Sequence, residues 1–177
     1  MRYYRWKLGD TVGPIKIFQY DCSGRTNLDV LGRQLASYVR SISNEVNLVG
    51  FSMGGIVIRS AMLHDPTLPV RRTAYLCSPH HGSVMAYLVP WLPACRQLMP
   101  TSEFMARLDA QPTRVPALNV WCPGDLMVMP GSNARLDNAA AQHTCWVPWH
   151  TWPLFSPQLA RAVTQHLTQP AERRRTR

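Results

Sequence analysis

The spacing of apolar and polar residues changes several times along the chain, and each spacing predicts one kind of element. Residues 14–20 alternate apolar and polar positions, which is the period of a half-buried strand, and end at the turn-forming run 21–24. Short apolar runs predict four further strands, at 46–49, 73–77, 117–122 and 144–147. Helical spacing predicts three helices, one capped by Asn27 and extending to Ile42, one over 54–63 and one over 157–167.

Strands that alternate with helices predict an α/β fold with a mostly parallel sheet flanked by helices. Functional groups in such folds lie at the carboxyl ends of the strands. Each suggestive polar cluster of this chain follows a predicted strand: Asp21, Gly50 to Ser52, Ser78 to His81, Gly124 to Asp125, and His150. We expect one domain over 1–169, with a lid-like helical excursion at 87–113 and a basic, disordered tail at 170–177.

Composition narrows the classes of protein to consider. The 177 residues are 46% hydrophobic and 16% charged, which suits a packed domain, and no apolar run is long enough for a transmembrane segment. The net charge of +9 is partly carried by the tail, and the other basic residues are scattered, so we expect no nucleic-acid binding. Five cysteines without a CxxC spacing favour reduced thiols, with Cys77, Cys122 and Cys145 buried in strands.

The segment V-N-L-V-G-F-S-M-G-G at 46–55 contains G-x-S-x-G between a predicted strand and a predicted helix. This is the context of a nucleophile elbow, a sharp turn that presents a serine at the edge of a sheet. Ser52 is then the nucleophile, and the N–H of Met53 donates to the oxyanion hole. Gly50 and Gly54 are expected to be glycine because side chains there would collide with the neighbouring strand and helix. The alternative is an ordinary Gly-Ser-Gly turn.

The chain resembles the α/β-hydrolase superfamily, and within it the bacterial lipase and esterase branch. The matching segments are LVGFSMGGIVIR at 48–59, LCSPHHGS at 76–83, CPGDLMVMP at 122–130 and WHTWPLFSPQLARAVTQHL at 149–167. The resemblance implies an α/β-hydrolase fold and a serine hydrolase that cleaves carboxylic esters through an acyl-enzyme intermediate. A small acyl ester or lipid would be the substrate, and no metal or organic cofactor would be needed. An acyltransferase or thioesterase on the same triad remains open.

The superfamily order Ser, Asp, His selects the other catalytic residues. Asp125 follows a strand in a Gly-Asp turn and is preferred over Asp109 and Asp137, which lie away from a strand end. His150 lies between the last strand and the last helix, where the resemblance places the base; His64, His143 and His166 are less well placed. Four residues near these positions are candidates for substrate binding, although loop support is an alternative for both histidines: Phe51, His80, His81 and Trp149.

One part of the superfamily pattern has no match in this chain. A strand and a His-Gly loop that supply the second oxyanion donor normally precede the strand expected at 15–20, and residues 1–13 resemble the helix that follows that loop. We therefore expect a sheet that lacks its first strands, and we assign no residue as the second donor. A truncated, catalytically inactive hydrolase-fold protein is the main alternative. A cytoplasmic location is expected, although an upstream segment could carry a signal; the oligomeric state stays open.

Overall fold

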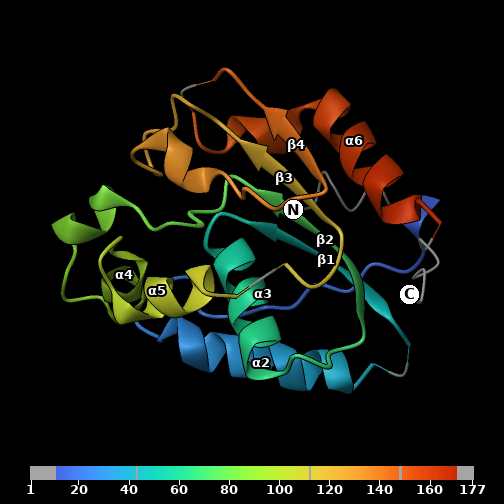
Figure 1. Cartoon of the computed structure of the whole chain (residues 1–177), viewed down its shortest axis with the longest axis horizontal. Helices are drawn as coiled ribbons and strands as arrows, with labels where there is room; N and C mark the ends of the chain where they lie inside the picture. Colours follow the sequence, from blue (N-terminus) through green and yellow to red (C-terminus); the bar gives the residue numbers. More distant parts are fainter. Residues whose placement is uncertain (1–10, 43, 112, 148, 171–177) are drawn as a thin grey trace.

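A four-stranded, all-parallel sheet forms the centre of the molecule (Figure 1). The computed structural model describes residues 11–42, 44–111, 113–147 and 149–170. The strands lie in the same order in the sheet as in the sequence: β1 (Val46–Phe51), β2 (Val70–Leu76), β3 (Ala117–Trp121) and β4 (Ala141–Thr144). Parallel pairing brings all carboxyl ends to one edge, so the loops that carry the candidate site start from that edge.

Helices cover both faces of the sheet, as the alternation of elements predicted (Figure 1). Helices α2 (Leu28–Arg40) and α3 (Met53–His64) share one buried apolar cluster with Tyr75, while α6 (Pro157–Thr168) packs against Ala74 and Leu76 on the opposite face. Neighbouring residues of β2 therefore enter different cores, which is the side-chain period of a strand. The strand is almost entirely buried because each of its faces has a helical layer.

The segment between β2 and β3, where a lid-like excursion was expected at 87–113, is largely helical, and its use as a lid stays a prediction. It contains the 3₁₀ helix η1 (Val84–Leu88) and two short α-helices, α4 (Pro93–Leu98) and α5 (Glu103–Asp109). Figure 1 shows α4 and α5 side by side next to α2 and α3, away from α6. Phe104, Met105 and Leu108 are buried in the same cluster as α2 and α3, so α5 is anchored to the domain by apolar packing.

Two expected strands differ from the observed ones. No strand forms over residues 14–20, and these residues pair with no strand of the described chain. A cavity of about 990 Å³ lies between this segment and β1, so the backbone groups of 14–20 have no ladder to join. A sheet without its first strands was expected, and β1 is one edge of the sheet in the described residues.

The last strand spans Ala141–Thr144 instead of 144–147. Three of its four residues are exposed, because β4 is the other edge of the sheet and borders solvent. The apolar residues that suggested a strand, Cys145 to Val147, follow it. His143 consequently lies within β4 rather than before it.

Several expectations fall on other parts of the chain. The helix expected within residues 1–13 lies mostly outside the described residues, and so does nearly all of the basic tail at 170–177. No helix among those that the structure describes is long and apolar enough to cross a membrane. The helices expected from Asn27, over 54–63 and over 157–167 are confirmed to within a few residues at each end.

Candidate active site

Ser52 lies at a sharp turn between β1 and α3. Its φ of 52° is in the left-handed region, which a residue with a side chain rarely adopts, and it is the N-cap of α3. The N–H of Ser52 donates to the carbonyl of Leu76 in β2 at 2.8 Å, and its own carbonyl accepts from Gly55. The strained residue is thus held from both sides. Backbone strain of this kind is concentrated at functional sites.

Two close approaches of the backbone explain the glycines around Ser52. A Cβ at Gly50 would lie 2.6 Å from the nitrogen of Gly55, and a Cβ at Gly55 would lie 2.0 Å from the hydroxyl of Ser78. The steric expectation for Gly50 is therefore confirmed, but the one for Gly54 is wrong. A Cβ at Gly54 would meet only the Tyr20 hydroxyl, at 3.3 Å, because this position faces the end of a side chain instead of a backbone. The turn requires Gly50 and Gly55.

His150 joins the Ser52 turn to the loop after β3. Its Nε2 lies 2.7 Å from the Ser52 hydroxyl, and its Nδ1 lies 2.6 Å from Oδ2 of Asp125. With Nδ1–H donating to the carboxylate, Nε2 is left as an acceptor for the Ser52 hydroxyl. The ring of Phe51 lies 4.9 Å from the imidazole, centroid to centroid, and packs against it. Residues from three separate loops thus form one continuous chain of hydrogen bonds.

The carboxylate of Asp125 is buried and fully engaged. Its side chain has no exposed surface; Oδ2 binds His150, and Oδ1 accepts from the N–H groups of Met127 and Val128 at 2.8 and 3.2 Å. Burial by itself would raise the pKa of Asp125, but the hydrogen bonds from His150 and from these two N–H groups hold it below its ordinary value. The turn therefore keeps Asp125 ionised beside the imidazole.

The rival residues occupy other environments. Asp109 pairs with Arg59 and His81, and Asp137 is an exposed partner of Arg135 at 3.8 Å. His64 pairs with Asp29, and His166 donates to backbone carbonyls in the core. Neither aspartate and neither histidine belongs to the hydrogen-bond chain that ends at Ser52.

Met53 is the first residue of α3, so its N–H has no acceptor within the helix and points out of the helix start. This is the geometry in which a backbone N–H can donate to an anion beside Ser52, and the N-terminal end of the helix dipole favours negative charge there. Within the part of the chain that the structure describes, no group of three or more His, Cys, Asp or Glu side chains could hold a metal ion.

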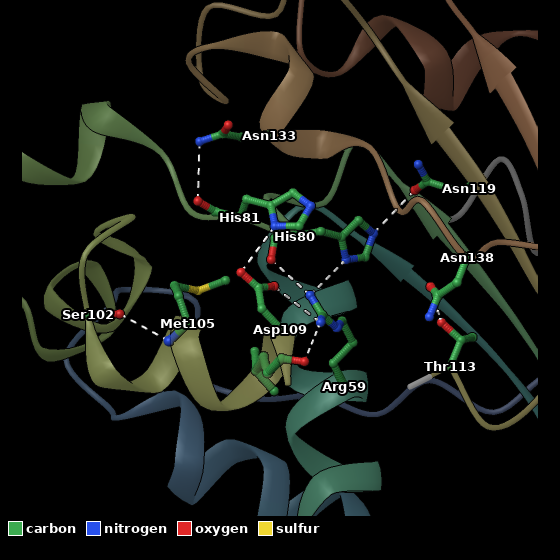
Figure 2. A network of polar contacts seen from close by, with 11 residues as sticks. Arg59, His80, His81, Ser102, Met105, Asp109, Thr113, Asn119, Asn133 and Asn138 are labelled. Carbon is green, nitrogen blue, oxygen red and sulfur yellow. Dashed lines mark hydrogen bonds and ion pairs between the residues drawn. The ribbon is translucent and has the colours of Figure 1, made fainter. Parts of the chain in front are cut away.

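His80 and His81 follow β2 and have different surroundings (Figure 2). The ring of His80 is completely buried; its Nε2 lies 3.2 Å from Oδ1 of Asn119, and burial lowers its pKa well below the ordinary value. A role of His80 in substrate binding does not fit this position, because the ring has no access to solvent. His81 is partly exposed, and its hydrogen bond to Asp109 raises its pKa. Figure 2 shows both rings directed into this polar network, which supports the alternative of a loop held by hydrogen bonds.

Large exposed apolar side chains lie next to two of the triad residues in the sequence. Leu126 and Met127, directly after Asp125, are 56% and 58% exposed, and Trp149, directly before His150, is 67% exposed. The start of η1 is tied to the same loop, because the N–H of Val84 donates to Met129 at 2.9 Å. The apolar residues of η1 and of the loop after it are exposed as well: Val84, Tyr87, Leu88 and Trp91.

Three thiols lie beneath the site at the ends of β2, β3 and β4. Cys77 and Cys122 are buried with their sulfur atoms 3.5 Å apart, and Cys145 is half-buried. All three are free thiols. The expectation that they are buried within strands is wrong in two respects, because each directly follows its strand and Cys145 is only partly buried. The contact with Cys145 lowers the pKa of Cys122, but the contact with Cys77 and burial outweigh it, so the pKa of Cys122 is raised to about 12. The contact with Cys122 and burial raise the pKa of Cys145, so neither thiol is a ready nucleophile.

Two residues beside the triad were not singled out from the sequence. Ser83 ends the segment S-P-H-H-G-S and bonds to the loop of Asp125, while Arg59 in α3 binds the carbonyl of His80. A serine after glycine and an arginine inside a helix are common in proteins, so the residue pattern alone singles out neither Ser83 nor Arg59. Both lie in segments that resemble the α/β-hydrolase superfamily, which is the one signal in the sequence that could have drawn attention to them.

Comparison with solved structures adds to this geometry. A lipase of Bacillus licheniformis, BlEst2 in its mature form, matches at 24% identity over 76% of this chain and 75% of its own, with a TM-score of 0.57. A monoacylglycerol lipase of Paleococcus ferrophilus matches at 14% identity over 81% and 76%, with a TM-score of 0.62. An extracellular α/β-hydrolase of a Paenibacillus species matches at 10% identity over 95% and 93%, also with a TM-score of 0.62.

No model of a protein family matches the chain, and neither does any curated protein sequence. The similarity to solved structures is therefore one of backbone arrangement. It covers most of this chain and includes structures described as lipases and hydrolases. The chain's own all-parallel sheet with a helical layer on each face agrees with this similarity. The protein has the α/β-hydrolase fold.

Proposed function

We propose that the protein is a serine hydrolase that cleaves carboxylic esters through an acyl-enzyme intermediate. The observation that carries the proposal is the chain of short contacts from Ser52 through His150 to Asp125, at 2.7 and 2.6 Å. A serine hydroxyl is a weak nucleophile unless an adjacent base accepts its proton, and that base needs a partner that orients it. The candidate site has all three groups in contact.

In the proposed mechanism, the Ser52 oxygen attacks the ester carbonyl while His150 takes its proton. The negative oxygen that develops is stabilised by the N–H of Met53, and Asp125 stabilises the imidazolium. His150 then gives the proton to the leaving alcohol, and the acyl group remains on Ser52. Water attacks the acyl-enzyme with the help of His150, which releases the acid and restores Ser52.

Apolar acyl groups or lipids are the substrate class that the surroundings of the site support. Leu126, Met127 and Trp149 are all more than half exposed and lie next to catalytic residues in the sequence. Exposed apolar side chains on the loops that carry reactive groups favour ligands with large apolar parts. Phe51 and Trp149 are proposed to contact the substrate, and His81 is kept as a weaker candidate at the rim of the network.

The direct test is an ester panel with increasing acyl length, assayed with the wild type and with Ser52→Ala. We expect hydrolysis that disappears in Ser52→Ala, and kcat/KM that rises from acetyl to medium-length acyl groups. Equal rates for the two proteins would contradict the proposal. Preference for the shortest ester would contradict the apolar substrate class and leave the serine mechanism intact.

The same assay separates hydrolysis from acyl transfer. Adding an alcohol or a thiol offers the acyl-enzyme a second acceptor, and a hydrolase predicts free acid as the main product at low acceptor concentration. A new ester or thioester that exceeds the free acid at low acceptor concentration would identify an acyltransferase on the same triad.

A further inference from the structure

The hydroxyl of Ser83 is bonded to three backbone groups. Ser83 lies in the loop between β2 and η1, is 5% exposed, and is not part of the triad. Its Oγ accepts from the N–H groups of Met85 at 3.2 Å and Met129 at 3.0 Å, and lies 2.8 Å from the carbonyl oxygen of Met127. Two of these groups, Met127 and Met129, belong to the loop that carries Asp125.

The direction of these hydrogen bonds follows from the valence of a hydroxyl. A serine hydroxyl has one proton and two lone pairs. Two N–H donors occupy the lone pairs of Ser83, so its single proton is directed at the carbonyl of Met127. All three bonding positions of the hydroxyl are used, which fixes its orientation.

The peptide group that accepts this proton also holds the catalytic carboxylate. The carbonyl of Met127 and the N–H of Val128 are the two ends of one planar unit. That N–H donates to Oδ1 of Asp125 at 3.2 Å, and Oδ2 of the same carboxylate binds His150 at 2.6 Å. Hydrogen bonds in series polarise one another, and a planar peptide transmits orientation from one end to the other. The chain of bonds therefore runs from Ser83 through one peptide to Asp125, His150 and Ser52.

We propose that Ser83 is a positioning residue for Asp125: it fixes the Met127–Val128 peptide and, through it, the carboxylate that orients His150. This inference rests on the proposed serine mechanism. Ser83 does not touch the substrate, so its effect is on the chemical step instead of on substrate binding.

Ser83 can act as a fixed point because its loop is anchored to the helix that starts at Ser52. Arg59 in α3 donates to the carbonyl of His80 at 2.8 Å, and the amide of Asn133 donates to the carbonyl of His81 at 3.2 Å (Figure 2). The same amide also donates to the carbonyl of Gly82 at 3.2 Å. Arg59 is also 3.5 Å from Asp109 of α5. The nucleophile helix and the turn of the acid are thus joined through residues 80–83.

The test compares Ser83→Ala with Ser83→Thr in the ester assay. Removing the hydroxyl frees the Met127–Val128 peptide, and misplacing a catalytic group by about 1 Å costs up to about 100-fold. We expect kcat to fall about 10- to 100-fold in Ser83→Ala, with KM within about twofold of the wild type. Ser83→Thr keeps the hydroxyl and is expected to retain kcat within about threefold.

Ser102→Ala is the matched control. Ser102, at the start of α5, likewise donates to a backbone carbonyl, that of Gln97. It accepts from a backbone N–H, that of Met105 (Figure 2). The Ser102→Ala variant loses hydrogen bonds from a hydroxyl to the backbone, as Ser83→Ala does, and therefore loses some stability. Its kcat is expected to stay within about threefold of the wild type. If Ser83→Ala does not fold, Ser83→Cys takes its place, because a thiol has a similar size and is a weak donor.

A second measurement reports on the His150–Asp125 bond without turnover. The Nδ1 proton of His150 should give a far-downfield proton resonance, which we expect to weaken or move upfield in Ser83→Ala but not in Ser102→Ala. An unchanged resonance and kcat in Ser83→Ala would overturn the role of Ser83. So would an equal loss of kcat in Ser102→Ala, or a loss confined to KM. Absence of Ser52-dependent turnover in the wild type would instead refute the proposed function.

Discussion

Gly50→Ala should disrupt the turn that presents Ser52, because the added methyl group would collide with backbone. The new Cβ would lie 2.6 Å from the nitrogen of Gly55 and 2.7 Å from both the carbonyl carbon of Gly54 and the Cα of Gly55. Ordinary contacts begin near 3.4 Å, so β1 and α3 must separate by about 0.8 Å. Overpacking of this kind typically costs about 1–3 kcal/mol, and displacement of Ser52 from His150 should lower kcat by at least about tenfold.

Urea unfolding and ester hydrolysis would measure the two effects. With a slope of about 1–3 kcal/mol per molar, we expect the urea midpoint to fall by roughly 1 M in Gly50→Ala. Gly54→Ala is the matched control: its Cβ would meet only the Tyr20 hydroxyl at 3.3 Å, and alanine favours the helix over glycine by about 0.5–1 kcal/mol. A wild-type midpoint and kcat in Gly50→Ala, or an equal loss in Gly54→Ala, would refute the steric account of the turn.

Two further predictions concern charged groups. Asp125→Asn removes the carboxylate that holds the Nδ1–H tautomer of His150 and should lower kcat by about 10³- to 10⁴-fold with an unchanged circular dichroism spectrum; a loss below tenfold would contradict the role of Asp125. His81→Gln should remove a pH-dependent part of the stability, because the hydrogen bond to Asp109 raises the pKa of His81 in the folded protein. The stability that this pair contributes is complete below the unfolded pKa of about 6.5 and is lost as pH rises through the pKa of His81 in the folded protein. The wild-type Tm should therefore drop more than that of His81→Gln between about pH 6 and pH 8.5. The difference should be small, below about 1 kcal/mol, because both side chains of the pair are 39% exposed; identical pH profiles of Tm would refute it.

The parallel sheet and its helices could be predicted because their sequences carry local signals. Residues 117–122 form an apolar run that becomes the buried strand β3, and apolar residues at helical spacing after Asn27 become the buried face of α2. Residues 14–20 have the alternation of a strand and form none, since a strand needs a neighbour and none of the described strands lies beside it. At β4 the apolar signal pointed three residues too far along the chain, because this edge strand is polar.

The candidate site shows the same division between local and long-range information. The elbow around Ser52 could be predicted because the turn depends on adjacent residues. The burial of His80 beside Asn119 and the reach of Ser83 to Met127 join residues 39 and 44 positions apart, and no local pattern encodes such contacts. Whether position 54 accepts a side chain depends on the atom that faces it, here the Tyr20 hydroxyl, and the expected collision at Gly54 was wrong for that reason. These features follow from packing between elements.

The central claim is that Ser52 is an activated nucleophile in an assembled site. Labelling with a fluorophosphonate probe tests it most directly, because the probe reacts with a serine hydroxyl only when an adjacent base activates it. We predict stoichiometric labelling of the wild-type protein on Ser52, with labelling abolished in Ser52→Ala and strongly reduced in His150→Ala. A folded wild-type protein that takes up no probe, or one that is labelled equally in Ser52→Ala, would contradict the account.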